Sequence, residues 1–329
     1  MNEKDVVLIL TEKIWSAVSP YLGQASAREI TGWAASGDPT FRIDEIGEEI
    51  LYECVKDKGP DWAYFSEDKG LVKFGPAPRF LLVVDPVDGS RPAAVGFEAA
   101  CVSVALADYR KEKPAFKDIK YGCLKEIKGD RLFWAERGKG TKIFHCQAQR
   151  SRGAQEQGSG GAAQIFPNQE EIPVVLSSNQ DMERLRWSFE VVGRPSLPLF
   201  QFIGSLVDTS AVKGACFLLS SSSFTTSRIL LGQLDAHVDV GGRLLREYPE
   251  SLKTAKVLGG GKILGPCPYD IAASYLIAKE AGCMVSDAYG QGLDDFPLLE
   301  GPEAGLSYLV SANEIIHKKI LNFFQKGRQ

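Results

Sequence analysis

Hydrophobic positions in the first half of the chain change from a helical to a strand-like spacing. Apolar residues recur at three- and four-residue intervals over residues 5–22 and 46–55, which predicts two amphipathic helices. Short apolar runs bounded by turn residues then predict strands at residues 62–66, 80–85, 100–107, 119–124 and 131–136. Because several of these strands follow one another with no helix between them, we expect an antiparallel or mixed sheet in an α+β layer.

The second half of the chain alternates between strands and helices. We expect strands at residues 174–176, 236–240 and 284–286, and helices at residues 179–192, 270–281 and 312–324. Residues 147–172 are rich in Gly, Gln and Ser, which is typical of a flexible loop or linker. We therefore expect an N-terminal α+β domain over residues 1–146 and a C-terminal α/β domain over residues 173–329.

The composition argues against several classes of protein. Of the 329 residues, 44% are hydrophobic and 24% are charged, as in an ordinary soluble globular protein. The net charge of −4 gives no reason to expect a nucleic-acid partner, and no run of about 18 apolar residues indicates a membrane span. The first residues do not form a secretory signal. Seven scattered cysteines without a Cys-x-x-Cys pair favour reduced thiols in a cytoplasmic protein.

The most informative stretch is Asp-Pro-Val-Asp-Gly-Ser at residues 85–90, directly after an apolar run. Asp85 and Asp88 repel each other on one tight turn unless a cation lies between them, and hard cations such as Mg²⁺ prefer oxygen ligands. Gly89 allows the backbone to turn, and Ser90 supplies a hydroxyl group. An Asx-type turn with no bound ligand explains the same residues about as well.

Other carboxylates stand at the ends of predicted elements. Glu67 follows the strand at residues 62–66, where a solvated loop residue is the ordinary interpretation. Asp44 and Asp270 each begin a predicted helix, where a helix N-cap is the ordinary interpretation. The sequence has only three histidines, so metal chemistry based on histidine is not expected.

Taken together, these motifs resemble the inositol monophosphatase superfamily. The resemblance rests on Ser-Glu-Asp at residues 66–68, the turn at residues 85–90, and Tyr-Asp-Ile-Ala-Ala at residues 269–273, with Glu-Ala-Gly at residues 280–282 on the same helix. It runs from about residue 38 to residue 287. It implies a layered α/β/α/β/α sandwich of the inositol monophosphatase and fructose bisphosphatase type, and a metal-dependent, lithium-sensitive phosphatase that is usually a dimer.

The resemblance also implies roles for individual residues. Two or three Mg²⁺ ions, for which Mn²⁺ is a possible substitute, would be held by Glu67, Asp85, the carbonyl of Val87, Asp88 and Asp270. The catalytic residues would be Asp44, Ser90 and Glu67, with Ser90 and Asp44 orienting the attacking water. The phosphate would contact Gly89, Ser90 and Arg91. The chemistry is sound in itself, because metal ions neutralise a phosphate dianion that would otherwise repel hydroxide.

Some positions depart from the family pattern and bear on the substrate. Arg91 follows Ser90 in place of the usual Asn, and Ile263 is aligned with a family glutamate that contacts the sugar ring. From Ile263 we expect a sugar phosphate or bisphosphate to be a better substrate than inositol monophosphate. The basic residues considered as contacts for a second phosphate or a sugar are Arg91, Arg184, Arg186, Lys213, Arg243 and Arg246.

The resulting hypothesis is a Mg²⁺-dependent phosphatase that acts on a small phosphorylated sugar or polyol, of the fructose 1,6-bisphosphate or inositol phosphate class. We expect no nucleic acid and no membrane as partners, and a homodimer. Three alternatives stay open. They are a phosphatase of 3′-phosphoadenosine 5′-phosphate, a family member that binds or regulates without catalysis, and a structural Ca²⁺ or Mg²⁺ site.

Overall fold

A computed structural model describes residues 2–110, 112–146 and 170–326. Its larger sheet has eight strands in the order β10-β9-β8-β7-β6-β5-β3-β4. All neighbouring strands are antiparallel except β3 and β5, which are parallel. The mixed sheet expected from the sequence is therefore present. Its strands are β3 (Trp62–Ser66), β4 (Gly70–Lys73), β5 (Phe80–Asp88), β6 (Cys101–Asp108), β7 (Ile119–Glu126), β8 (Arg131–Glu136), β9 (Thr141–His145) and β10 (Glu170–Ile172).

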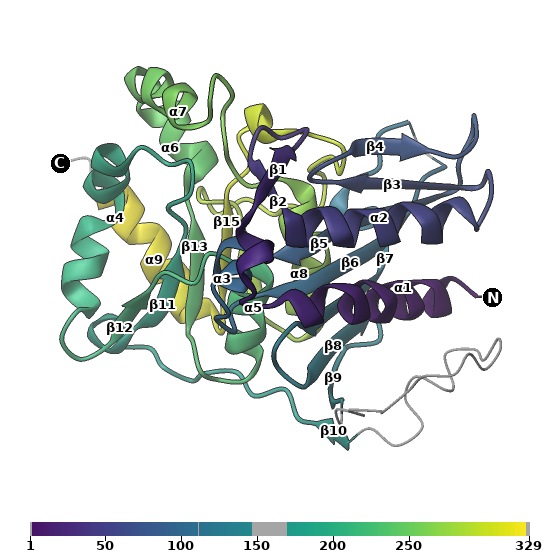
Figure 1. Cartoon of the computed structure of the whole chain (residues 1–329). Helices are drawn as coiled ribbons and strands as arrows, with labels where there is room; N and C mark the ends of the chain where they lie inside the picture. The colour runs from purple at the N-terminus through teal and green to yellow at the C-terminus, as the bar shows by residue number, and fades with distance from the viewer. Residues whose placement is uncertain (1, 111, 147–169, 327–329) are drawn as a thin grey trace.

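Both faces of the larger sheet are covered, which explains the continuous apolar run of β5. Leu81 and Val83 point into one hydrophobic core and Leu82 and Val84 into another, because successive side chains of a strand alternate between faces. Helices α1 (Glu3–Val18) and α2 (Arg42–Lys56) lie along one face (Figure 1). Helix α8 (Pro268–Glu280) packs on the other face.

The smaller sheet has five strands in the order β12-β11-β13-β15-β14. One face packs against α5 (Ser222–Leu230) and α8, and the other packs against α4 (Ser196–Ser210) and α9 (Glu314–Lys326). The molecule is thus the layered α/β/α/β/α sandwich expected from the sequence, with α5 and α8 between the sheets. The strands are β11 (Arg186–Phe189), β12 (Ala215–Phe217), β13 (Ala236–Asp239), β14 (Met284–Ser286) and β15 (Tyr308–Ser311).

Smaller elements complete the fold. A hairpin of β1 (Ile30–Trp33) and β2 (Pro39–Phe41) lies beside α2. The short helix α3 (Ser90–Ala94) follows β5, and α6 (Gly241–Glu247) and α7 (Leu252–Leu258) follow β13. No helix among the described residues has the length and apolar character that crossing a membrane requires.

The helix expected over residues 179–192 is wrong. This segment forms a short 3-10 helix, Met182–Arg184, and then β11. Leu185, Trp187 and Phe189 are all buried, and this two-residue period is that of a strand. Residues 174–176 form only an isolated bridge, in which Val175 pairs with Leu231.

The expected flexible segment at residues 147–172 lies mostly outside the described residues. Its last three residues form β10, which pairs with β9, so this part is ordered as an edge strand. Helix α8 belongs to the second half of the sequence and packs against the sheet of the first half. The division of the chain into domains on either side of residues 147–172 stays a prediction.

Candidate active site

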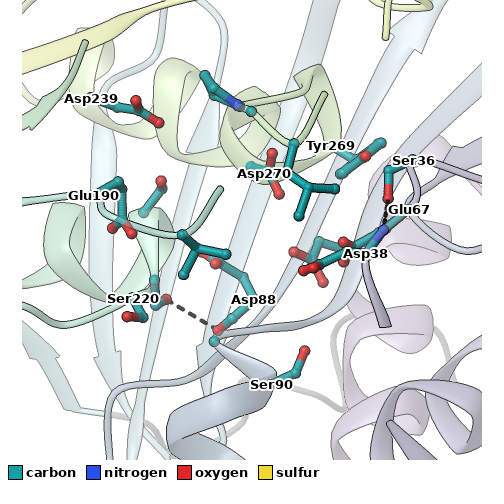
Figure 2. Close-up of a pocket in the computed structure, with 18 of the residues that line it drawn as sticks. Ser36, Asp38, Glu67, Asp88, Ser90, Glu190, Ser220, Asp239, Tyr269 and Asp270 are labelled. Carbon is teal, nitrogen blue, oxygen red and sulfur yellow. Dashed lines mark hydrogen bonds between the residues drawn. The ribbon is translucent and has the colours of Figure 1, made fainter. Parts of the chain in front are cut away.

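One cavity gathers the acidic residues from three separate parts of the chain (Figure 2). Glu67 follows β3, Asp85 and Asp88 stand at the end of β5, and Asp270 lies in the first turn of α8. Because β3 and β5 are parallel neighbours, their carboxyl ends meet at one edge of the sheet, where ligands of α/β proteins commonly bind. The cavity has a volume of ≈ 110 Å³.

The turn after β5 is held by its own side chains. The N–H of Val87 donates to Oδ1 of Asp85 at 3.0 Å, and the Ser90 hydroxyl donates to the Val87 carbonyl at 3.0 Å. Gly89 has φ +100°, and a Cβ atom at this position would lie 2.3 Å from the carbonyl oxygen of Ala99. The residue must therefore be glycine for both conformational and steric reasons. The cavity is lined by Asp85, Val87, Gly89 and Ser90 of this turn.

Asp88 is fixed by the beginning of α5, a contact that sequence reasoning missed. The N–H of Ser223 donates to Oδ2 of Asp88 at 2.5 Å, and the Ser221 hydroxyl donates to the Asp88 carbonyl at 3.1 Å. The run of serines at residues 220–223 was the available signal, because serine is favoured at helix starts. This contact joins the cavity wall of the larger sheet to the layer of helices between the sheets.

Asp270 and Asp44 both serve as capping residues, at the third helical position instead of the expected N-cap. The N–H of Cys267 donates to Asp270 at 2.6 Å, and the N–H of Phe41 donates to Asp44 at 2.9 Å. Asp270 lines the cavity as well, so capping and cavity lining occur together. Asp44 is buried and does not line the cavity. Its carboxyl interacts with Ser90, and Ser90 does line the cavity.

The carboxyl groups of the cavity are held in conditions that oppose their ionisation. Burial raises the pKa of Glu67, Asp85 and Asp270, and repulsion among these acids adds to the effect. Burial also raises the pKa of Asp88 to about 6, although hydrogen bonds from the serines of α5 partly offset it. Burial raises the pKa of Asp44 to about 7, and hydrogen bonds to Ser90 and Phe41 reduce the shift.

Two arginines line the cavity, and each is already paired with a carboxylate. Arg91 forms two hydrogen bonds to Asp38, at 2.9 and 2.8 Å. Arg194 pairs with Asp239, and both side chains are buried. In the described part of the chain, no ion pair involves Glu67, Asp85, Asp88 or Asp270. The four acids therefore share a cavity whose two guanidinium groups are occupied elsewhere.

The carboxylate oxygens of the cavity suit a hard cation, but the side chains as placed do not form a complete metal-binding site. Asp85, Asp88 and Asp270 each use one carboxylate oxygen to accept a backbone N–H, and serines at the start of α5 interact further with Asp88. Carboxylate oxygens are the ligands that Mg²⁺ prefers. As placed, no three His, Cys, Asp or Glu side chains of the described segments converge on one point. Metal binding at this position would require the carboxylates to rotate toward each other.

The opposite wall of the cavity holds residues other than Ile263, on which the substrate inference was based. Ile263 is buried and does not line the cavity, whereas the carboxylate of Asp239 does. The alignment of Ile263 with a family glutamate stays a prediction, and the next residue, Leu264, does line the cavity. Glu190, Arg194 and Asp239 were missed by the sequence analysis, and Figure 2 shows Glu190 and Asp239 on the side of the cavity away from Glu67.

Most of the basic residues considered as substrate contacts lie elsewhere. Arg91 is the one candidate among them that lines the cavity; Arg184, Arg186, Lys213, Arg243 and Arg246 do not. Arg243 is buried and donates to the carbonyls of Ala288 and Phe324, so it stabilises the smaller-sheet layer. Lys213 pairs with Glu183 at the surface. Contact between Arg91 and phosphate stays a prediction. A phosphate bound there would compete with Asp38 for the Arg91 guanidinium group.

Comparison with known proteins shows what the chain resembles as a whole. The model of the inositol monophosphatase family matches residues 4–327. The chain is 25% identical over 338 residues to the bifunctional NADP phosphatase/NAD kinase of Methanococcus maripaludis, covering 98% of this chain and 49% of that protein. This chain thus spans about half the length of that relative.

A second relative is matched along nearly its whole length. The chain is 25% identical over 323 residues to the fructose-1,6-bisphosphatase/inositol-1-monophosphatase of Methanothermobacter thermautotrophicus, covering 97% of this chain and 95% of that protein. Among solved structures, the IMPase of Thermotoga maritima matches with a TM-score of 0.64 and 17% identity, covering 100% of this chain and 98% of that chain. The structural likeness establishes the fold.

Proposed function

The chain belongs to the inositol monophosphatase family, and on that premise we propose that it is a metal-dependent phosphatase that hydrolyses a phosphate monoester of a small sugar or polyol. The observation that carries the proposal is the set of four cavity carboxylates, Glu67, Asp85, Asp88 and Asp270, which come from three elements and have no ion pair among the described residues. Such a set is costly without a cation, because like charges within one cavity repel.

The same residues are the ones that would hold Mg²⁺. Glu67, Asp85, Asp88, Asp270 and the carbonyl of Val87 are the proposed ligands, and the Val87 carbonyl has a second lone pair besides the one that accepts from Ser90. Bound Mg²⁺ would neutralise the phosphate dianion, lower the pKa of a water molecule and stabilise the leaving oxygen. The Gly89 and Ser90 N–H groups are the proposed donors to the phosphate, and they act locally, because α3 is only 5 residues long.

The proposed reaction uses water as the nucleophile. Ser90 and Asp44 orient the water, whose oxygen attacks phosphorus while the bond between phosphorus and the ester oxygen breaks. The proton released by the water passes through the Ser90 hydroxyl to Asp44, and the departing ester oxygen takes a proton from solvent. The relay requires the Ser90 hydroxyl, which donates to the Val87 carbonyl at 3.0 Å, to turn toward Asp44, whose pKa its proximity already lowers.

The charges of the cavity favour a substrate with a single phosphate. A second phosphate needs a cationic partner, and both guanidinium groups in the cavity are bound to carboxylates, Arg91 to Asp38 and Arg194 to Asp239. Glu190 has one carboxylate oxygen, Oε1, without a hydrogen-bond partner in the described chain, which suits contact with a hydroxyl group and disfavours a second anion. We therefore rank a monophosphate of a neutral polyol above fructose 1,6-bisphosphate, the reverse of the order inferred from Ile263.

A second candidate substrate is NADP. It is suggested by the relative from Methanococcus maripaludis, whose name includes NADP phosphatase, and this chain covers 49% of that protein. NADP carries a diphosphate besides the phosphate that distinguishes it from NAD. The cavity arginines would have to exchange Asp38 or Asp239 for that diphosphate, or the diphosphate would have to stay outside the cavity. 3′-Phosphoadenosine 5′-phosphate presents the same difficulty.

The deciding experiment is phosphate release from a panel of substrates in the presence of Mg²⁺. The panel contains inositol 1-phosphate, fructose 1,6-bisphosphate, NADP and 3′-phosphoadenosine 5′-phosphate, each with and without EDTA. We expect inositol 1-phosphate to exceed fructose 1,6-bisphosphate in kcat/KM and EDTA to stop turnover. Full turnover in excess EDTA would reject the metal-dependent mechanism. Binding of Mn²⁺ with no turnover of any compound would favour the non-catalytic alternative.

A further inference from the structure

The smaller sheet contributes a carboxyl group to the catalytic cavity that has no part in the reaction described above. Glu190 follows directly after β11, and Asp239 is the last residue of β13. Because β11 and β13 are parallel and Phe189 pairs with Val238, the two acids occupy neighbouring positions at the carboxyl edge of this sheet. Both line the cavity, on the side away from Glu67 (Figure 2).

The two acids differ in their partners. Asp239 forms a salt bridge with the buried guanidinium group of Arg194 and accepts the N–H of Gly241 at 2.9 Å. Glu190 is 8% exposed, its Oε1 has no hydrogen-bond partner, and no ion pair of the described residues includes it. The one guanidinium group on this wall is therefore committed to Asp239, and Glu190 is left without a counter-charge.

These surroundings favour the protonated form of Glu190. Burial is the largest cause and raises the pKa of Glu190 to about 8; repulsion by Asp239 adds to the rise, and Arg194 acts in the opposite direction. Asp88 and Asp270 add smaller repulsions. A bound cation would cancel these two, but burial and Asp239 would remain. Enzymes that use a carboxylic acid as a proton donor place it in such surroundings, next to a second acid that stays ionised.

The wall on which Glu190 lies is the one that the leaving group would face. The water oriented by Ser90 and Asp44 attacks phosphorus from the side of the larger sheet. In phosphoryl transfer the attacking and leaving oxygens lie roughly in line, on opposite sides of phosphorus. The departing oxygen therefore points toward the side of the smaller sheet. In a sugar or polyol phosphate this oxygen departs as an alkoxide, a strong base whose departure is accelerated when an acid protonates it.

We propose, on the basis of the proposed function, that Glu190 is the general acid that protonates the departing ester oxygen. As the bond between phosphorus and the ester oxygen breaks, the proton of the Glu190 carboxyl group passes to that oxygen, and the product leaves as a neutral alcohol. Glu190 is then a carboxylate, and solvent returns its proton before the next turnover. Solvent thus supplies the proton overall, and Glu190 delivers it when the bond breaks.

The test compares two kinds of leaving group, with the full chain at saturating Mg²⁺. The first substrate is the compound of the panel above that is hydrolysed fastest, because every compound of that panel releases an alcohol. The second is 4-nitrophenyl phosphate, whose leaving oxygen is stable as an anion and needs no proton. We expect Glu190→Gln to lower kcat/KM at least about 100-fold for the first substrate and less than about threefold for the second.

Two controls accompany this comparison. Glutamine has nearly the size of a protonated glutamate, and Oε1 of Glu190 has no hydrogen-bond partner to lose, so the variant should fold. Its turnover of 4-nitrophenyl phosphate reports directly that the cavity is intact. Glu250→Gln, at an exposed acid outside the cavity, should retain the activity of the wild type toward both substrates.

Three results would overturn the role of Glu190 and leave the proposed function in place. Equal losses for the two substrates would show that Glu190 only shapes the cavity. No loss for either would show that the departing oxygen needs no proton from this residue. Turnover of 4-nitrophenyl phosphate by the wild type, with none of any compound of the panel, would show that no acid serves an alcohol. A lack of Mg²⁺-dependent turnover of every substrate would instead reject the proposed function, and the role of Glu190 with it.

Discussion

At the scale of single residues, the candidate site depends on acids that use one oxygen for the backbone. Asp85, Asp88 and Asp270 each accept a backbone N–H, at 3.0, 2.5 and 2.6 Å respectively. Each of these bonds orients a side chain and occupies one of its two carboxylate oxygens. Structural and functional interpretations of the same acid, which compete when only the sequence is known, are thus compatible in the folded chain.

Asp88→Asn is the first prediction at this scale. Asparagine can still accept the N–H of Ser223 through its carbonyl oxygen, so the turn should survive while one negative charge is lost. We expect kcat/KM to fall at least about 100-fold, or about 2.7 kcal/mol, and Mn²⁺ affinity measured by calorimetry to fall with it. Asp61→Asn, at an exposed acid outside the cavity, is the control that should retain both. Normal turnover of Asp88→Asn would remove this residue from the proposed ligands.

The second prediction concerns the attacking group. If water attacks phosphorus, acid-quenched enzyme should carry no covalent phosphate after brief exposure to ³²P-labelled substrate. The double variant Ser90→Ala, Asp44→Asn should lower kcat more than it changes KM, because these residues orient water and do not bind the substrate's polyol part. A phosphorylated residue, or normal turnover of the double variant, would contradict the proposed mechanism. Circular dichroism would check folding, since Asp44 also caps α2.

At the scale of elements, the parts predicted best were those with a regular local pattern. The strands expected at residues 62–66, 131–136 and 284–286 coincide with β3, β8 and β14. The helix expected at residues 179–192 was wrong because the alternation of apolar and polar residues from Leu185 to Phe189, which is the period of a strand, was not used. Glu190 lies just after that strand and was missed for the same reason. Arg194 and Asp239 were missed because their pairing joins residues 45 positions apart, which no local pattern shows.

The turn between β5 and α3 gives a prediction at this scale. Gly89→Ala combines a left-handed backbone with a collision, because its Cβ would lie 2.3 Å from a carbonyl oxygen. Gly261→Ala is a matched control, with φ +105° against +100° and no atom within 4 Å of the added Cβ. We expect Gly261→Ala to lower the free energy of unfolding by about 1 kcal/mol and Gly89→Ala by at least about 2 kcal/mol more. Urea titrations measure both, and equal losses would show that the turn relaxes around the methyl group.

At the scale of the whole molecule, the layers are joined by buried polar contacts as well as by apolar packing. His317 on α9 is one of these, since its ring nitrogens contact the hydroxyls of Ser286 on β14 and Ser311 on β15 at 2.8 and 3.2 Å. It is 5% exposed. Burial lowers the pKa of His317 to about 4 from its ordinary value of 6.5. The outer layer of the smaller sheet therefore packs around an imidazole that stays neutral.

This neutral imidazole makes the stability of the molecule depend on pH in a definite direction. Above the unfolded pKa of 6.5, His317 is neutral in both states and its full contribution to the free energy of unfolding is present. As the pH falls toward 4, the unfolded chain binds a proton that the folded chain does not, so the free energy of unfolding decreases. Between about pH 7.5 and about pH 5 the loss from His317 is about 2 kcal/mol. The cavity acids with raised pKa act in the opposite sense, so the wild type alone does not isolate the effect. We expect His317→Gln to lose about 2 kcal/mol less than the wild type over this interval in urea titrations. Parallel pH profiles of the wild type and His317→Gln would show that the buried ring accepts its proton without cost.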